Sequence, residues 1–160
     1  AGAIVVLCFF FHLRVFDEHK DYSDDLKHYP DRILQSGLIT LRHLKILGAL
    51  AITAELVLCA WKGIPTLTTL LITVGFSVLM LKEFFLRKWL NRHFILYAVS
   101  HMLVMPLLAL TLLLMNNRPR WVGTGFRNGW PANLALIVTL LFFSYAALSK
   151  AAEVIAKLAG

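Results

Sequence analysis

The chain has 160 residues, of which 59% are hydrophobic and 16% are charged, and it carries a formal net charge of +7. Because soluble domains contain about 45–50% apolar and about 25% charged residues, this composition argues against a soluble domain and predicts an integral membrane protein. The sequence has no arginine-rich run and no alternation of basic and aromatic residues, so we expect no nucleic-acid partner.

Apolar segments predict an all-α fold, an integral membrane helical bundle in which residues 1–160 form a single domain. The expected transmembrane helices lie at about residues 1–16, 38–61, 66–86, 94–115 and 132–149. The first would reach only about 24 Å, short of the roughly 30 Å hydrocarbon core. It starts in an apolar run without Met or a basic leader, so we expect a piece of a larger bundle. Residues 62–65 predict a tight turn, and Pro106 predicts a kink.

Residues 17–37 form a polar, Asp-rich segment between the first two predicted spans. It holds six of the nine acidic residues, namely Asp17, Glu18, Asp21, Asp24, Asp25 and Asp31. If this segment faces the cytoplasm, twelve of the 16 lysines and arginines lie on the cytoplasmic side. The positive-inside rule therefore predicts a cytoplasmic location for the acidic segment.

Three of these acids, Asp17, Asp21 and Asp25, are spaced four residues apart. On a helix this spacing places their carboxylates in a row on nearly one face, about 6 Å apart, where they repel one another without a cation. Mg²⁺ takes one or two carboxylates together with substrate phosphates, so the row is suited to hold a diphosphate through bridging metal. The alternative is a solvated acidic face balanced by nearby basic residues, Lys20, Lys27 and His28.

The turn that follows carries a second element. An acidic helix followed by Arg32, with Gly37 five residues later, resembles the first signature of the UbiA-type intramembrane prenyltransferases. That signature is Asn-Asp-x-x-Asp-x-x-x-Asp, followed by Arg-Pro-x-x-x-Gly-x-Ile-Ser. The matching positions here are Asp21, Asp25, Arg32, Gly37, Ile39 and Thr40, the last in place of Ser. The departures are Asp17 in place of Asn, Glu18 in place of the first Asp, and a proline, Pro30, that precedes Arg32.

The resemblance implies a bundle of about nine helices, of which about five are present here, with two Asp-rich motifs on the cytoplasmic side. Mg²⁺ would hold a prenyl diphosphate, whose ionisation gives an allylic cation that alkylates an aromatic or other lipophilic acceptor. The implied metal ligands are Asp17, Glu18, Asp21 and Asp25, of which Asp21 and Asp25 are the catalytic pair. After Asp31 the only acids are Glu55, Glu83 and Glu153. Missing helices of the full-length chain would therefore supply the second motif, and we expect no turnover by this chain alone.

Basic residues on the same side of the membrane are candidates for binding the diphosphate. Arg32 matches the motif, whereas Arg14 would either bind diphosphate or extend to the membrane interface. Lys88 belongs to a basic stretch with Lys82, Arg87 and Arg92 that membrane topology alone also explains. Within the spans, the polar residues Glu55, His12 and His101 are either functional or hydrogen-bonded between helices.

Two functions of other classes stay open. A divalent-cation transporter or permease component would use the acidic segment as a cytoplasmic vestibule, but only Glu55 and His101 could then continue the pathway through the spans. A membrane interaction module would need no ligand. Neutralising Asp21 and Asp25 together would leave the function of such a module untouched.

Overall fold

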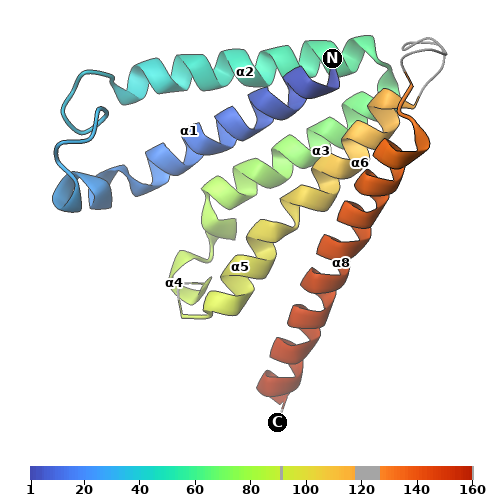
Figure 1. Cartoon of the computed structure of the whole chain (residues 1–160). Helices are drawn as coiled ribbons and strands as arrows, with labels where there is room; N and C mark the ends of the chain where they lie inside the picture. The colour runs from blue at the N-terminus through green and yellow to red at the C-terminus, as the bar shows by residue number, and fades with distance from the viewer. Residues whose placement is uncertain (91, 118–126, 160) are drawn as a thin grey trace. The chain divides into compact units, whose positions relative to one another are not determined.

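A computed structural model describes residues 1–90, 92–117 and 127–159, and all regular secondary structure in these ranges is helical (Figure 1). The all-α class predicted from the sequence is thus confirmed for the described residues. The residues expected to form one domain pack as two compact units, of which the first comprises Ala1–Leu58 and the second begins at Cys59.

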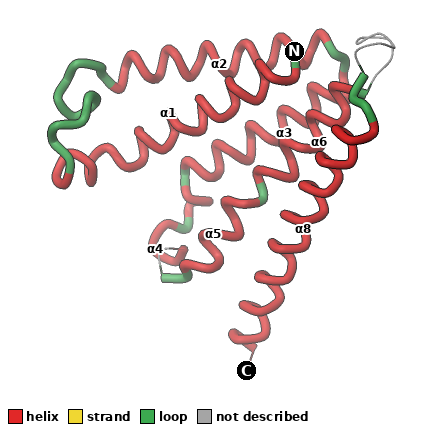
Figure 2. The backbone as a smooth tube through the Cα atoms, in the orientation of Figure 1, coloured by secondary structure: helices red, strands yellow, loops and turns green. Residues whose placement is uncertain are grey.

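The first unit is a pair of antiparallel helices joined by a turn-rich connection (Figure 2). Its helices are α1 (Gly2–His28) and α2 (Leu41–Trp61), of which the last residues of α2 lie beyond the unit. α1 continues well past the predicted span 1–16 because no glycine or proline interrupts residues 3–28. It ends at His28, because Tyr29, the residue before Pro30, leaves the helical region with φ −140° and ψ 59°. The acidic residues up to Asp25 therefore lie on a regular helix.

The inward face of α1 carries Val5, Phe9, His12 and Val15, which are all buried and recur at helical spacing. Near Val15, α2 comes so close that a Cβ atom on Gly48 would lie 3.0 Å from Val15 Cγ1. Glycine permits this approach because it has no side chain. Gly48 therefore sets the distance between the two helices at this point.

The second unit contains the remaining helices. They are α3 (Ile64–Leu81), the 3₁₀ turn η1 (Glu83–Phe85), α4 (Arg87–Leu90), α5 (Phe94–Met102), α6 (Val104–Asn116) and α8 (Trp130–Ala159). α3 packs against α6, and α8 packs against α5 and α6. α5 and α6 are separated at Leu103, three residues before Pro106. Pro106 has no N–H to bond to the carbonyl of Met102, which accounts for this interruption of the helix.

The third predicted span, 66–86, ends earlier than expected. α3 stops at Leu81, and Glu83, Phe84 and Phe85 then adopt left-handed φ values of 47°, 53° and 59°. Such values are uncommon for residues other than glycine, so surrounding contacts must hold the turn. The Phe84 ring packs edge-on against Phe76 and His101, with ring centroids 5.4 and 6.1 Å away.

Four helical segments are long and apolar enough to cross a membrane: Leu41–Trp61, Ile64–Leu81, Phe94–Asn116 and Trp130–Lys150. These four segments support a membrane protein, and the expected count of five spans is not confirmed for the described residues. The predicted first span is not among them, because α1 carries charged residues from Arg14 onward. Nothing in the described residues confirms the larger bundle of about nine helices. The predicted turn at residues 62–65 is confirmed, with Gly63 at φ 107° and α3 starting at Ile64.

Candidate functional site

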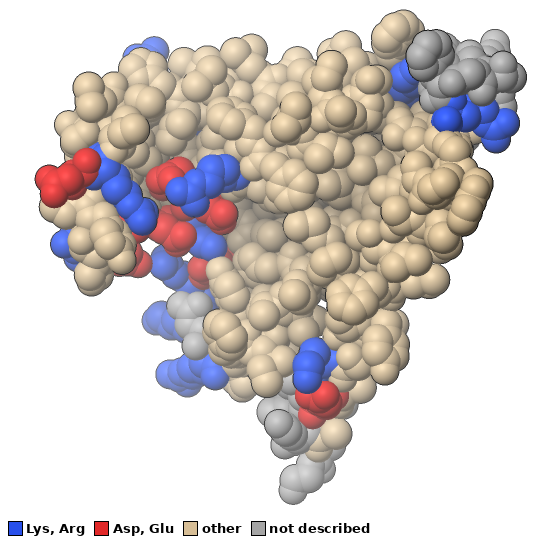
Figure 3. Space-filling model, viewed as in Figure 1, with Lys and Arg blue, Asp and Glu red and all other residues tan. Residues whose placement is uncertain are grey.

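The candidate site lies where the C-terminal half of α1 meets the connection to α2. Acidic and basic side chains gather over this region, whereas most of the surface around the helices in the same view is uncharged (Figure 3). The site is built from two parts of the first unit: a regular helix that carries acids one turn apart, and a connection that returns to it with further charged side chains.

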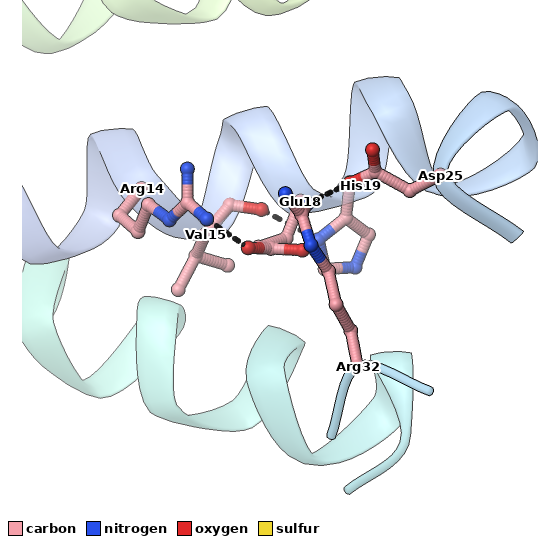
Figure 4. Close-up of polar contacts among 6 residues, drawn as sticks. All are labelled: Arg14, Val15, Glu18, His19, Asp25 and Arg32. Carbon is pink, nitrogen blue, oxygen red and sulfur yellow. Dashed lines mark hydrogen bonds and ion pairs between the residues drawn. The ribbon is translucent and has the colours of Figure 1, made fainter. Parts of the chain in front are cut away.

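Two arginines pair with two of the acids (Figure 4). Arg14 donates from Nη2 to Glu18 Oε1 one turn further along α1. Arg32 reaches back from the connection, and its Nη1 donates to Asp25 Oδ2 at 2.9 Å. The Arg32 guanidinium also lies over the Tyr29 ring, with Cζ 4.4 Å from the ring centroid. This aromatic contact supports the guanidinium independently of the carboxylate.

An open pocket of about 470 Å³ adjoins these pairs, and all of its lining residues belong to the first unit. Its charged and amide side chains are Arg14, Glu18, Asp31, Arg32 and Gln35. Its apolar side chains are Ile33, Leu34, Ile39 and Leu44, from the connection and the start of α2. The pocket therefore combines two guanidinium groups and two carboxylates with an apolar wall. This lining suits an oxyanion that is attached to a hydrocarbon chain and accompanied by a cation.

Gln35 adds a feature that the sequence does not suggest. Both its side-chain nitrogen and its side-chain oxygen are enclosed, and neither makes a hydrogen bond to any residue that the structure describes. Enclosed amide groups nearly always have a hydrogen-bond partner. An amide in this state, at the wall of a charged pocket, is able to donate to or accept from a polar ligand.

The four predicted metal ligands lie on one side of α1, within an arc of about 100°, but they differ in burial. Glu18, Asp21 and Asp25 are half-buried, at a spacing that keeps them on one side together with Arg14, whereas Asp17 is exposed. Asp17 pairs instead with Lys20, with Oδ1 and Nζ 3.8 Å apart. In the described ranges, no three His, Cys, Asp or Glu side chains converge closely enough to hold a metal ion by themselves. A cation here would need ligands from a substrate.

The alternative of a solvated acidic face finds partial support. The contact between Asp17 and Lys20 is the kind of surface ion pair that this alternative predicts. His28, however, bonds through Nδ1 to the backbone carbonyl of Asp24 at 2.8 Å, and not to a carboxylate. His19 likewise donates from Nδ1 to the carbonyl of Val15 at 2.8 Å. Glu18 and Asp25 are 18% and 19% exposed, against 56% for Asp17, and they pair with the arginines that line the pocket.

Lys88 is the predicted diphosphate ligand that the pocket does not include. It lies on α4 in the second unit and is exposed, like its neighbours Arg87 and Trp89. Arg87 pairs with Glu83, whose buried carboxylate oxygen Oε2 lies 3.2 Å from Arg87 Nε. Arg14 and Arg32 are thus the two predicted phosphate ligands that the structure brings to one pocket.

A buried polar pair in the first unit connects two residues that the sequence presents separately. His12 Nδ1 on α1 and Glu55 Oε1 on α2 share a hydrogen bond of 2.8 Å, and both side chains are 0% exposed. Glu55 Oε2 is buried and has no hydrogen bond among the described residues. The interhelical alternative considered for both residues therefore holds. The signal in the sequence is that each is an isolated polar residue in an apolar stretch.

Comparison with known proteins leaves the family open: no family model matches the chain, and no curated protein and no solved structure matches it either.

Proposed function

We propose that this chain provides one half of an Mg²⁺-dependent prenyl diphosphate site, in an enzyme that transfers the prenyl group to a lipophilic acceptor at the membrane surface. The observation that carries the proposal is the pocket, which joins Arg14 and Arg32 to an apolar wall beside the half-buried acids of α1. The similarity of residues 21–40 to the UbiA-type signature supports the same chemistry.

The donor set fits Mg²⁺ when the substrate completes it. Glu18, Asp21 and Asp25 offer carboxylate oxygens on one face of α1, and Mg²⁺ usually takes only one or two carboxylates plus phosphate oxygens and water. When bound, the metal would neutralise the diphosphate and so favour its departure. In this proposal Arg32 and Arg14 offset the remaining phosphate charge, Asp21 and Asp25 hold the metal, and the apolar wall receives the first part of the isoprenoid tail.

The test is calorimetric titration of a non-hydrolysable farnesyl diphosphate analogue into the detergent-solubilised protein, with and without Mg²⁺. We expect binding that needs Mg²⁺ and that Asp21→Asn and Asp25→Asn each weaken at least tenfold. Asp24→Asn is the matched control, because Asp24 is an exposed residue of the same helix and the substitution removes the same charge.

Two results would contradict the proposal. If Asp24→Asn weakened binding as much as the other two substitutions, the effect would reflect the charge of the segment and not a site. If the protein bound Mg²⁺ or Mn²⁺ but ignored the diphosphate analogue, a divalent-cation transporter component would be the better description.

A further inference from the structure

The two arginine–carboxylate pairs beside the pocket affect how Mg²⁺ and the diphosphate bind there. This inference rests on the proposed function. We propose that Arg32 and Asp25, and in the same way Arg14 and Glu18, exchange partners when ligand binds. Without ligand, each guanidinium forms an ion pair with its carboxylate. With ligand the guanidinium turns to a phosphate oxygen and the carboxylate turns to the metal.

The geometry of Arg32 allows this exchange. Its contact with Asp25 uses Nη1, whereas a guanidinium has five N–H donors in a fixed fork, so further donors can meet an oxyanion. Tyr29 lies under the guanidinium and holds it near the pocket when Asp25 is released. The Arg32 side chain is 49% exposed, so water and ligands can reach it.

The strength of the pairs also suits a reversible exchange. Arg–carboxylate pairs at this exposure contribute little to stability, because water competes for both charges and salt screens them. Each arginine–carboxylate pair therefore lowers the affinity of its carboxylate for Mg²⁺ only modestly. Gln35, whose amide atoms lack hydrogen bonds within the described residues, supplies an additional donor or acceptor to a ligand in the same pocket.

The exchange makes the two ligands mutually dependent. Mg²⁺ alone has to displace a guanidinium from Asp25, and a diphosphate alone has to displace a carboxylate from Arg32. When both arrive, every charge regains an opposite partner. Binding of Mg²⁺ and binding of the diphosphate should therefore strengthen each other by the same factor, as thermodynamic linkage requires.

The decisive experiment compares Arg32→Gln with wild type for two ligands measured separately. We expect Arg32→Gln to bind Mg²⁺ alone about 2- to 5-fold more tightly, because Asp25 has lost its competing partner. The same variant should bind the farnesyl diphosphate analogue, at saturating Mg²⁺, about tenfold or more weakly, because a charge-assisted hydrogen bond is lost. A higher affinity for Mg²⁺ together with a lower affinity for the diphosphate analogue would identify the exchange of partners.

Two further variants make the experiment interpretable. Arg32→Lys keeps the charge and loses the planar fork, so Mg²⁺ alone should bind nearly as in wild type while the analogue weakens. Lys150→Gln breaks an ion pair with Glu153 of similar length, at 2.9 Å, on α8, and should change neither affinity. Thermal unfolding of each variant checks that it is folded before titration.

The outcomes separate this inference from the proposed function. If Arg32→Gln weakens Mg²⁺ and the analogue together, or leaves Mg²⁺ unchanged, Arg32 does not compete for Asp25 and the exchange is wrong, although the site itself stands. If wild type shows no Mg²⁺-dependent binding of the analogue, the proposed function fails and the exchange fails with it.

Discussion

Residues of α1 take part in two kinds of acid–base pair, which differ in their exposure to solvent. His12 and Glu55 are both 0% exposed, and their hydrogen bond joins α1 to α2 inside the first unit. Arg14 and Arg32 are 65% and 49% exposed and both line an open pocket. Of their carboxylate partners, Glu18 also lines the pocket, and Asp25 contacts it through Arg32. His12 and Glu18 are only six residues apart, about 9 Å along the helix.

The difference in exposure assigns different roles to similar contacts. The His12–Glu55 pair is closed off from bulk solvent, so it can fix how α1 and α2 pack. The arginine pairs face water, where an ion pair is weak and easily replaced. The same helix thus carries a permanent contact in its apolar half and exchangeable contacts in its acidic half.

The largest effect is expected from breaking the buried pair. Glu55→Leu should lower the free energy of unfolding by roughly 3 kcal/mol, because it removes the buried carboxylate that faces His12. The double variant His12→Leu/Glu55→Leu should recover most of this loss, since well-packed apolar residues often replace a buried pair without destabilisation. Unfolding in detergent, followed by circular dichroism, measures both. A double variant as unstable as Glu55→Leu would show that the two residues do not act as a pair.

A smaller effect is expected at the closest approach of the two helices. Gly48→Ala should destabilise the protein by about 1 kcal/mol, because the new methyl group meets Val15 Cγ1 and a β-branched side chain cannot rotate away easily. Gly75→Ala is the matched control within helix α3. A Cβ atom there meets nothing within 4 Å, so this change should stabilise by about 0.5–1 kcal/mol. Equal effects of the two substitutions would mean that the contact at Gly48 does not constrain the helices.

The smallest effect on stability is expected at the exposed pairs. Arg32→Gln should change the free energy of unfolding by less than about 1 kcal/mol, although it alters ligand binding. Lys150→Gln, which removes an exposed pair on α8, should have an effect of similar size. Measured in the same unfolding assay, a loss above about 2 kcal/mol for Arg32→Gln alone would show that this contact holds the fold. The contrast with the buried pair would then disappear.

The sequence was sufficient to predict the helical class, because composition and the length of the apolar runs depend on local properties alone. It also placed the acids of α1 on a helix and singled out Arg32 and Arg14, which both line the pocket. The five predicted spans are not confirmed, since α1 becomes charged too early to provide a long apolar segment within the described residues. The left-handed turn at Glu83–Phe85 has no signal in the sequence, because it contains neither glycine nor asparagine.

The amino-acid sequence was enough to show which residues carry charge and which segments favour helices. How the charged residues pair depends on the packing of the helices. His12 meets Glu55 across 43 residues, and Arg32 returns to Asp25 because the chain turns after Pro30. The packing also selected Glu18, Asp21 and Asp25, and not Asp17, as the half-buried acids. The physical reason is that spacing along a helix fixes the angle between side chains, whereas the neighbouring helix fixes which of those angles faces inward.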